Sequence, residues 1–152
     1  MESEIGPIYL VASERGLQSV SFEKKQVQMV TVLKKSSLEK NVLVTTIQQL
    51  SEYFSGRRKS FDLPLDLVGT EFQKKVWRQL LKIDYGKTFS YKDIAHQIKN
   101  KKAFRAVGSA NGKNPICIVI PCHRVIAADG GAGGYSGGLK IKLKLLKLEA
   151  AT

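Results

Sequence analysis

A cysteine, a histidine and an arginine stand side by side at residues 122–124, directly after a short apolar run. The run at residues 116–120 is mostly β-branched, which predicts a strand buried on both faces. Pro121 would end that strand, because proline has no backbone donor for a sheet. We therefore expect Cys122 to lie on a rigid support at the end of a strand, with its thiol facing a cleft.

These residue types in this order fit nucleophilic chemistry. A free thiol has a pKa of about 8.5 and is mostly protonated at neutral pH, so a nucleophilic cysteine needs a base or a positive field beside it. His123 is the candidate base and Arg124 the candidate cation. A free cysteine is more often a small core residue, and we favour that interpretation for Cys117. We do not favour it for Cys122, because the sequence Pro-Cys-His-Arg is too polar to continue a core.

The composition is that of a globular protein with one domain or two small ones. At 152 residues the chain can bury roughly two thirds of the surface that it exposes when unfolded. Hydrophobic residues make up 43% of the chain, and no apolar run approaches the ~18 residues of a membrane span. The first residues, Met-Glu-Ser-Glu, lack the basic and apolar regions of a secretion signal. We therefore expect a reducing compartment, in which both cysteines are thiols.

The formal net charge of +12 is concentrated in one half of the chain. Up to Asp66 there are nine lysines and arginines against eight acidic residues, whereas from Leu67 onward there are sixteen against five. Solubility gives no reason for this segregation, but phosphate binding does. Nucleic acid is the first candidate partner. An anionic membrane surface is a distant second, because no basic amphipathic helix with an aromatic face is evident.

The first half of the chain predicts a hairpin followed by a helix. Residues 5–22 hold two apolar stretches around a turn at Gly16, which is typical of a β-hairpin. Residues 42–46 form a possible strand. Residues 46–55 have apolar side chains at spacings of three and four, as in a helix, and Gly56 would stop that helix.

The helical pattern ends at residues 61–69, which lack helical periodicity and contain Pro64. The change in charge falls in the same segment. We take it as the boundary between an N-terminal domain, residues 1–66, and a C-terminal domain, residues 67–152. The candidate chemistry at 122–124 lies in the second.

The second half predicts three helices before the candidate nucleophile. Thr70 can cap a helix whose apolar stripe runs over residues 72–83. Two short helices, at 91–98 and 103–110, surround a tight turn and suggest a helix-turn-helix, whose second helix would approach DNA. The small side chains of that second helix leave Arg105 as its one long probe.

The end of the chain combines a glycine-rich loop with a helix. Residues 129–138 contain six glycines, and we expect this loop to wrap closely around a ligand, because an orderly helix follows at once. The helix at 139–150 has an apolar side and a basic side, formed by Leu139, Leu143, Leu146 and Ala150 and by Lys140, Lys144 and Lys147.

Several of these features together resemble the O6-alkylguanine-DNA alkyltransferase family. They are Pro-Cys-His-Arg-Val at 121–125, the upstream Asn114-Pro115, the start of a helix at 105–108 and Gly-Tyr-Ser-Gly-Gly at 134–138. The resemblance implies direct-reversal DNA repair, in which the alkyl group of O6-alkylguanine, and less efficiently that of O4-alkylthymine, moves irreversibly to the protein's own cysteine. It also implies a small N-terminal α/β domain, ribonuclease H-like, and a mostly helical C-terminal winged helix-turn-helix-like domain that binds DNA.

The resemblance also assigns roles to single residues. Cys122 is the acceptor, His123 is the base acting through a water, and Glu149 orients the imidazole, which is the logic of a catalytic triad. Asn114 braces the turn that holds this network. Tyr91 is the phenol that donates to guanine N3, so that guanine need not leave as a bare anion.

The remaining assignments concern DNA and the pocket. Arg105 is the finger that enters the base stack where the nucleotide is extruded. The other DNA contacts are Ser90, Tyr91, Lys101 and Ala106, and the pocket residues are Asn111, Val125, Tyr135 and Ser136. Asn111 and Cys117 differ from the larger apolar residue and the proline that other members have there, which bears on the size of alkyl group accepted.

We expect no cofactor and no metal, because His96, Cys117, Cys122 and His123 lack the paired spacing of a zinc site. The expected partner is duplex DNA containing O6-alkylguanine, with no membrane association. We expect a monomer in the cytoplasm, or in the nucleus of a eukaryotic cell.

Two other functions compete with this interpretation. A DNA-binding module without chemistry, such as a regulator or a lesion sensor, would use the helix-turn-helix alone; in such sensors the cysteine is typically replaced by tryptophan, whereas Cys122 is present here. A thiol hydrolase would use Cys122 and His123, but it gives the basic half no role and it would turn over.

Overall fold

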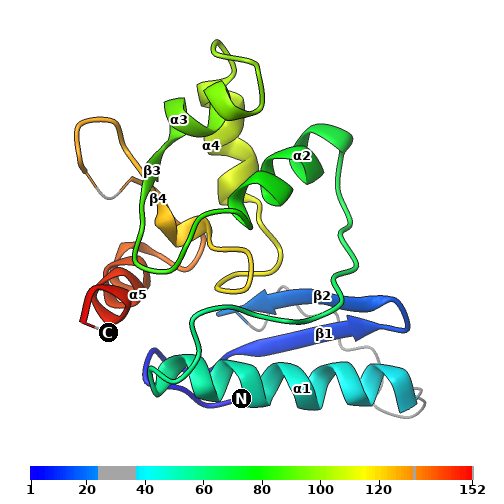
Figure 1. Ribbon diagram of the computed structural model, residues 1–152. Coiled ribbons are helices and arrows are strands. Elements are labelled where there is room, and N and C mark those ends of the chain that lie inside the picture. The colour runs from blue at the N-terminus through cyan, green and yellow to red at the C-terminus, as the bar shows by residue number, and fades with distance from the viewer. Residues whose placement is uncertain (24–36, 132, 152) are drawn as a thin grey trace. The chain divides into compact units, whose positions relative to one another are not determined.

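The structure is a computed structural model that describes residues 1–23, 37–131 and 133–151. They form two compact units, Met1–Val68 and Gly69–Thr152. The mixture of helices and two small sheets confirms the predicted α/β class (Figure 1). Within the described ranges, no helix is both long and apolar enough to cross a membrane.

The first unit is a β-hairpin packed against one long helix. Strands β1 (Tyr9–Ser13) and β2 (Gly16–Ser21) are antiparallel, which confirms the predicted hairpin. Helix α1 (Ser37–Phe54) contacts both strands, and the strand predicted at 42–46 is wrong, because these residues lie inside α1. Packing of one helical face overrides the β propensity of the valines in that segment. The buried residues of α1 recur at helical spacing and are Thr46, Gln49, Leu50, Tyr53 and Phe54.

The chain returns beside β2 before it enters the second unit. The N–H of Leu17 donates to the carbonyl of Pro64 at 2.8 Å, and the Leu17 carbonyl accepts from the N–H of Asp66 at 2.9 Å. Gly16 has a φ of +149°, and a Cβ at this position would lie 2.5 Å from the Pro64 oxygen. The close approach of the two backbones therefore requires glycine at residue 16.

Two capped helices open the second unit. Helix α2 (Glu71–Leu80) begins with a capping box between Thr70 and Gln73. Helix α3 (Tyr91–Gln97) begins with one formed by Ser90 and Asp93. Both helices are confirmed, although α2 ends three residues before the end of its predicted apolar stripe.

Helix α4 (Phe104–Gly112) packs against α2 and α3 (Figure 1). The indole N–H of Trp77 on α2 donates to the carbonyl of Ala110 on α4 at 2.9 Å, and Trp77 is buried. The helix predicted at 103–110 is confirmed, and α3 and α4 have the expected helix-turn-helix order.

A short parallel pair joins the helices to the candidate nucleophile. Strand β3 (Phe89–Ser90) immediately precedes α3, and β4 (Val125–Ile126) immediately follows residues 122–124. The two strands pair with Phe89 opposite Val125. The start of α3 is therefore held beside the segment that follows Cys122.

Residues 116–120 do not form the predicted strand. The N–H of Ile120 donates to the carbonyl of Ile116 at 2.9 Å, so the segment closes into a tight turn. Ile118 in this turn has a φ of +72°, which is unusual for a β-branched residue. A short apolar run fits a buried turn as well as a buried strand, and no local signal separates the two.

Helix α5 (Leu139–Ala151) closes the unit and contacts residues 122–124. The side with the predicted leucines is largely exposed, since Leu139 and Leu143 are 53% and 50% accessible. Its buried residues are Lys142, Leu145 and Glu149. The spacing of the leucines did not predict this buried face. The face includes Lys142 and Glu149, whose charged side chains have partners inside the protein.

Gly16→Ala should lower the free energy of unfolding of the first unit by about 2 kcal/mol, because alanine combines an unfavourable φ with a backbone clash. Urea unfolding measures this change. Gly112→Ala is the control, since a Cβ there meets nothing within 4 Å. An unfolding transition of the Gly16→Ala protein equal to that of the wild type would contradict the close approach described above.

Candidate active site

The 3₁₀ turn η3 (Cys122–Arg124) is buried as a whole. Cys122 and His123 have no exposed surface, and Arg124 is 6% exposed. The prediction that the thiol faces a cleft is therefore wrong, and so is the argument that this segment is too polar for a core. The charged side chain of Arg124 is buried because it pairs with Glu149.

The carboxylate of Glu149 lies at the centre of this pairing. Its Oε1 is 2.7 Å from Nε2 of His123. The guanidinium of Arg124 donates to both carboxylate oxygens at 2.9 Å. The N–H of Gly86 donates to Oε2 at 3.2 Å. One carboxylate therefore joins helix α5, the turn η3 and the segment before β3.

The protonation states of this group follow from its environment. Burial alone would raise the pKa of Glu149, but hydrogen bonds from His123 and Arg124 outweigh it and lower that pKa to about 2. Because an ionised carboxylate only accepts, His123 must carry its proton on Nε2. Burial lowers the pKa of His123, so the ring is neutral at pH 7. Its Nδ1 is buried and has no partner within the described residues, so its lone pair is available to accept a proton.

Arg124 does not supply the predicted positive field at the thiol. Its Nε and Nη2 are used by Glu149, and its Nη1 donates to the carbonyl of Ile83 at 2.6 Å. The arginine is the counterion of the buried carboxylate, and it anchors the turn after α2 to the site.

Lys142 is a residue that sequence reasoning missed. It has no exposed surface, and its Nζ donates to the carbonyls of Val125 at 2.6 Å and Gly134 at 3.2 Å. It therefore links β4 to the glycine-rich loop, and its charge opposes the rise in pKa that burial causes at Cys122. A signal was available, because Lys142 stands seven residues before Glu149 and so lies on the same face of a helix.

The thiol of Cys122 is protonated at rest. Complete burial raises the pKa of Cys122 well above its usual value, and the neighbouring Cys117 raises it further. A hydrogen bond with Cys122 is in turn the largest cause that lowers the pKa of Cys117. The sulfur of Cys117 also lies 3.4 Å from the hydroxyl oxygen of Ser136. Cys122 would therefore need a base in order to react as a thiolate, and neutral His123 is its sequence neighbour.

Two asparagines hold the backbone around the thiol. The amide of Asn114 donates to the carbonyl of Ile120 at 2.8 Å and accepts from the N–H of Ile116 at 2.9 Å, so it clamps the turn ahead of Cys122. The amide of Asn111, on α4, donates to the carbonyl of Cys122 at 3.3 Å. Both ends of the turn are thereby fixed.

Tyr91 begins α3 and stands against the glycine-rich loop. A Cβ at Gly133, which has a φ of +70°, would lie 2.8 Å from the tyrosine hydroxyl. The loop therefore passes close to the phenol only because residue 133 is glycine. Burial raises the pKa of Tyr91, and the Cys122 thiol adds to the rise, so the phenol remains a proton donor.

The residues assigned from sequence fall into two groups. One is the buried network around the thiol, which contains Cys122, His123, Glu149, Asn114, Asn111 and Val125 and is bordered by Tyr91, Tyr135 and Ser136. The other is outside that network: Arg105 and Ala106 are exposed on the first turn of α4, and Lys101 is exposed in the preceding turn. Ser90 caps α3 beside Tyr91 and pairs with Ile126 of β4. The described residues include no group of three or more His, Cys, Asp or Glu side chains that could hold a metal ion.

Comparison with known proteins gives consistent results over both units. Residues 71–151 match the model of the 6-O-methylguanine DNA methyltransferase DNA-binding domain, and residues 1–67 match that of its ribonuclease-like domain. A methylated-DNA–protein-cysteine methyltransferase from Methanosarcina barkeri is 48% identical over 98% of this chain and 94% of that protein. The protein of the same name from Mycobacterium leprae is 44% identical over 98% of this chain and 89% of its own length.

Among solved structures, the Mycobacterium tuberculosis protein OGT in complex with DNA is similar with a TM-score of 0.88 and 42% identity. The match covers 99% of this chain and 91% of that one. The likeness therefore extends over nearly the full length of both chains.

Glu149→Gln should lower the free energy of unfolding by roughly 3 kcal/mol at pH 7, because it leaves the buried charge of Arg124 without its counterion. Urea unfolding measures the difference. Glu71→Gln is the control and should change stability little, since its 3.7 Å pair with Lys74 lies at the surface.

The same difference should depend on pH. The pKa of Glu149 in the folded protein, about 2, lies below its ordinary value of 4.5. The stabilisation is therefore complete above about pH 4.5 and decreases as the pH falls toward 2. A difference between wild type and Glu149→Gln that stays constant over this range would contradict an ionised Glu149.

Proposed function

Because this chain belongs to the 6-O-methylguanine DNA methyltransferase family, we propose that Cys122 is its alkyl acceptor, with His123 as the base and Tyr91 as the proton donor to guanine. The protein acts in direct-reversal DNA repair by transfer of an alkyl group to one of its own cysteines. DNA binding and transfer belong to residues 67–152. A protein with this substrate works where the DNA is, in the cytoplasm of a prokaryotic cell or the nucleus of a eukaryotic one.

The buried hydrogen bond between His123 and Glu149, directly beside Cys122 in the sequence, is the observation that supports this proposal most. Glu149 fixes the tautomer of His123 and leaves Nδ1 free to accept a proton. Cys122 precedes this base directly, and its raised pKa makes assistance necessary. Cys117 has no histidine beside it in the sequence, and its sulfur contacts Cys122, the Ser136 hydroxyl and the Asn114 carbonyl.

The reaction balances without any further reagent. Cys122 gives its proton through a water to Nδ1 of His123, and the thiolate attacks the alkyl carbon. A carbon–sulfur bond forms as the bond to O6 breaks, and the electron pair of that bond goes to guanine. Tyr91 protonates guanine at N3, and the proton held by His123 then restores the phenol. The products are neutral guanine in DNA and a thioether on the protein.

The substrate must leave the duplex to reach this site. O6 of guanine lies inside the base stack, and extrusion of a nucleotide costs a few kcal/mol. Arg105 is exposed at the start of α4 and would fill the space that the extruded base leaves. Ala106 follows on the same turn, and its small side chain allows the helix to approach the groove closely.

Transfer should stop at one alkyl group per protein molecule. A thioether is not cleaved by water or by His123, so the acceptor is not regenerated. Incubation with excess DNA containing O6-methylguanine should add a single methyl mass to the intact chain, and peptide mapping should place it on Cys122. Cys122→Ala should bind the same DNA and transfer nothing, whereas Cys117→Ala should still transfer. Repeated turnover, or a methyl group on Cys117, would contradict the proposal.

Gly133→Ala should slow methyl transfer by about tenfold or more, because the added Cβ displaces the phenol of Tyr91 from its position. Single-turnover kinetics at saturating DNA measure the rate. Gly134→Ala is the matched control, since a Cβ at that neighbouring glycine meets nothing within 4 Å. Equal rates for the two variants would remove Tyr91 from the transfer step.

A further inference from the structure

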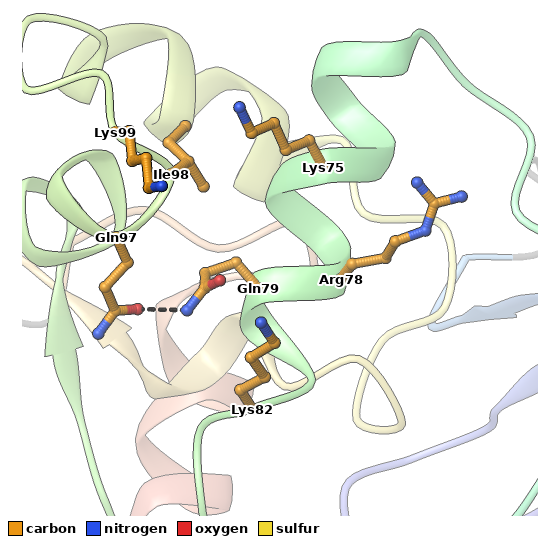
Figure 2. A pocket seen from close by; sticks show the side chains of 7 residues that line it. All are labelled: Lys75, Arg78, Gln79, Lys82, Gln97, Ile98 and Lys99. Carbon is orange, nitrogen blue, oxygen red and sulfur yellow. Dashed lines mark hydrogen bonds between the residues drawn. The ribbon is translucent and has the colours of Figure 1, made fainter.

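A basic pocket lies on the second unit, away from the buried network around Cys122. It has a volume of about 400 Å³ and is formed by α2 and by the end of α3, with Lys75, Arg78, Gln79, Lys82, Gln97, Ile98 and Lys99 as its lining. Figure 2 shows the side chains of Lys75, Lys82 and Lys99 extending toward the space between the two helices. None of the lining residues belongs to the site assigned from sequence.

The floor of the basic pocket is built from paired and apolar groups. The amide of Gln79 donates to the amide oxygen of Gln97 at 2.6 Å and ties α2 to α3 (Figure 2). Ile98 is 4% exposed and closes the bottom. The spacing of the lysines is therefore set by two helices that are joined to each other.

The cations of the pocket have no counterions in the described parts of the chain. Four of the lining residues are lysine or arginine and none is acidic. The nearest acidic residue along α2, Glu71, pairs with Lys74 instead. Lys75 and Arg78 are like-charged neighbours at a spacing of three on α2, an arrangement that destabilises a helix, and Lys82 adds a further positive charge in the turn that follows.

Lys99 adds an independent observation. It follows the end of α3 with a φ of +60°, the left-handed conformation in which glycine is favoured. The N–H of Asn100 donates to the carbonyl of Ala95, and the N–H of Lys99 to that of His96, which is the usual hydrogen-bond pattern around such a glycine. A lysine here gives up backbone freedom and places one more positive charge in the pocket.

The repulsion among these cations is unfavourable in the isolated protein and is relieved when an anion is bound. We propose that the basic pocket binds backbone phosphates of the same duplex that carries the lesion, at nucleotides flanking the extruded base. Its lining residue Lys99 begins the turn between α3 and α4, and the exposed cations Lys101 and Arg105 follow Lys99 along the chain. In helix-turn-helix proteins the first helix crosses the DNA backbone, so phosphates lie next to this turn. This inference rests on the proposed function only in taking DNA as the substrate.

The test compares two triple variants that lose the same charge. Lys75, Lys82 and Lys99 are changed together to Gln in the first, and Lys140, Lys144 and Lys147, which are exposed on α5, are changed to Gln in the second. Binding to undamaged duplex and to duplex with O6-methylguanine is measured over a range of KCl concentrations, and methyl transfer is measured at saturating DNA.

The pocket variant should bind both duplexes about fivefold or more weaker than the wild type, and its logarithmic salt slope should fall by about one for each phosphate that the variant no longer binds. The α5 variant should show much smaller changes. Transfer at saturating DNA should remain one group per protein in both. Equal binding by the two variants would overturn the inference. Absence of transfer by the wild type would overturn the proposed function and leave the binding comparison intact.

Two further measurements locate the bound phosphates. Duplexes shortened from one end or the other should abolish the difference between pocket variant and wild type when the arm that reaches the pocket is removed. Lys99→Gly should raise the melting temperature, because glycine suits the conformation, and it should also weaken DNA binding. A difference that persists on every shortened duplex, or full DNA affinity in Lys99→Gly, would contradict the proposed placement.

Discussion

The second unit depends on one buried negative charge. A carboxylate removed from water is costly unless it is paired and fully hydrogen-bonded, so Glu149 can be buried only if His123, Arg124 and the N–H of Gly86 come to it. These partners lie on segments distant in sequence. Lys142, on the same helix, can likewise be buried only if its ammonium group finds acceptors, and these are carbonyls of β4 and of the glycine-rich loop. Docking of α5 therefore sets the geometry of the thiol without contributing a nucleophile.

The resting site keeps its thiol unreactive. Burial holds Cys122 protonated, His123 is neutral, and the positive charge of Arg124 is neutralised by the carboxylate. An exposed thiolate would react with any electrophile or oxidant in the cell. A protein that can react only once gains from a nucleophile that is activated when a substrate is in place. A base that reacts with this thiol would therefore have to enter a site that is closed at rest.

Sequence predicts the elements that have local signals and misses those set at long range. The capping residues Thr70 and Ser90 predict where α2 and α3 begin, because a capping box involves only four consecutive residues. Local signals favour a strand at residues 116–120, since nothing local shows that Asn114 clamps them into a turn. The packing face of α5 stays hidden for the same reason, because Lys142 and Glu149 are buried by partners elsewhere in the chain. For the motif at 121–125, the resemblance to the family assigns residue roles that the spacing of the residues alone does not.

The complete burial of Cys122 also affects the protein after the reaction. A sulfur with no exposed surface has close-packed neighbours on every side, so a methyl group added to it must displace some of them. Overpacking of this kind typically costs about 1–3 kcal/mol. The clamped turn and the buried carboxylate network both adjoin the modified sulfur and would share the strain. A protein methylated on Cys122 would therefore be less tightly packed around η3 than the unmodified one.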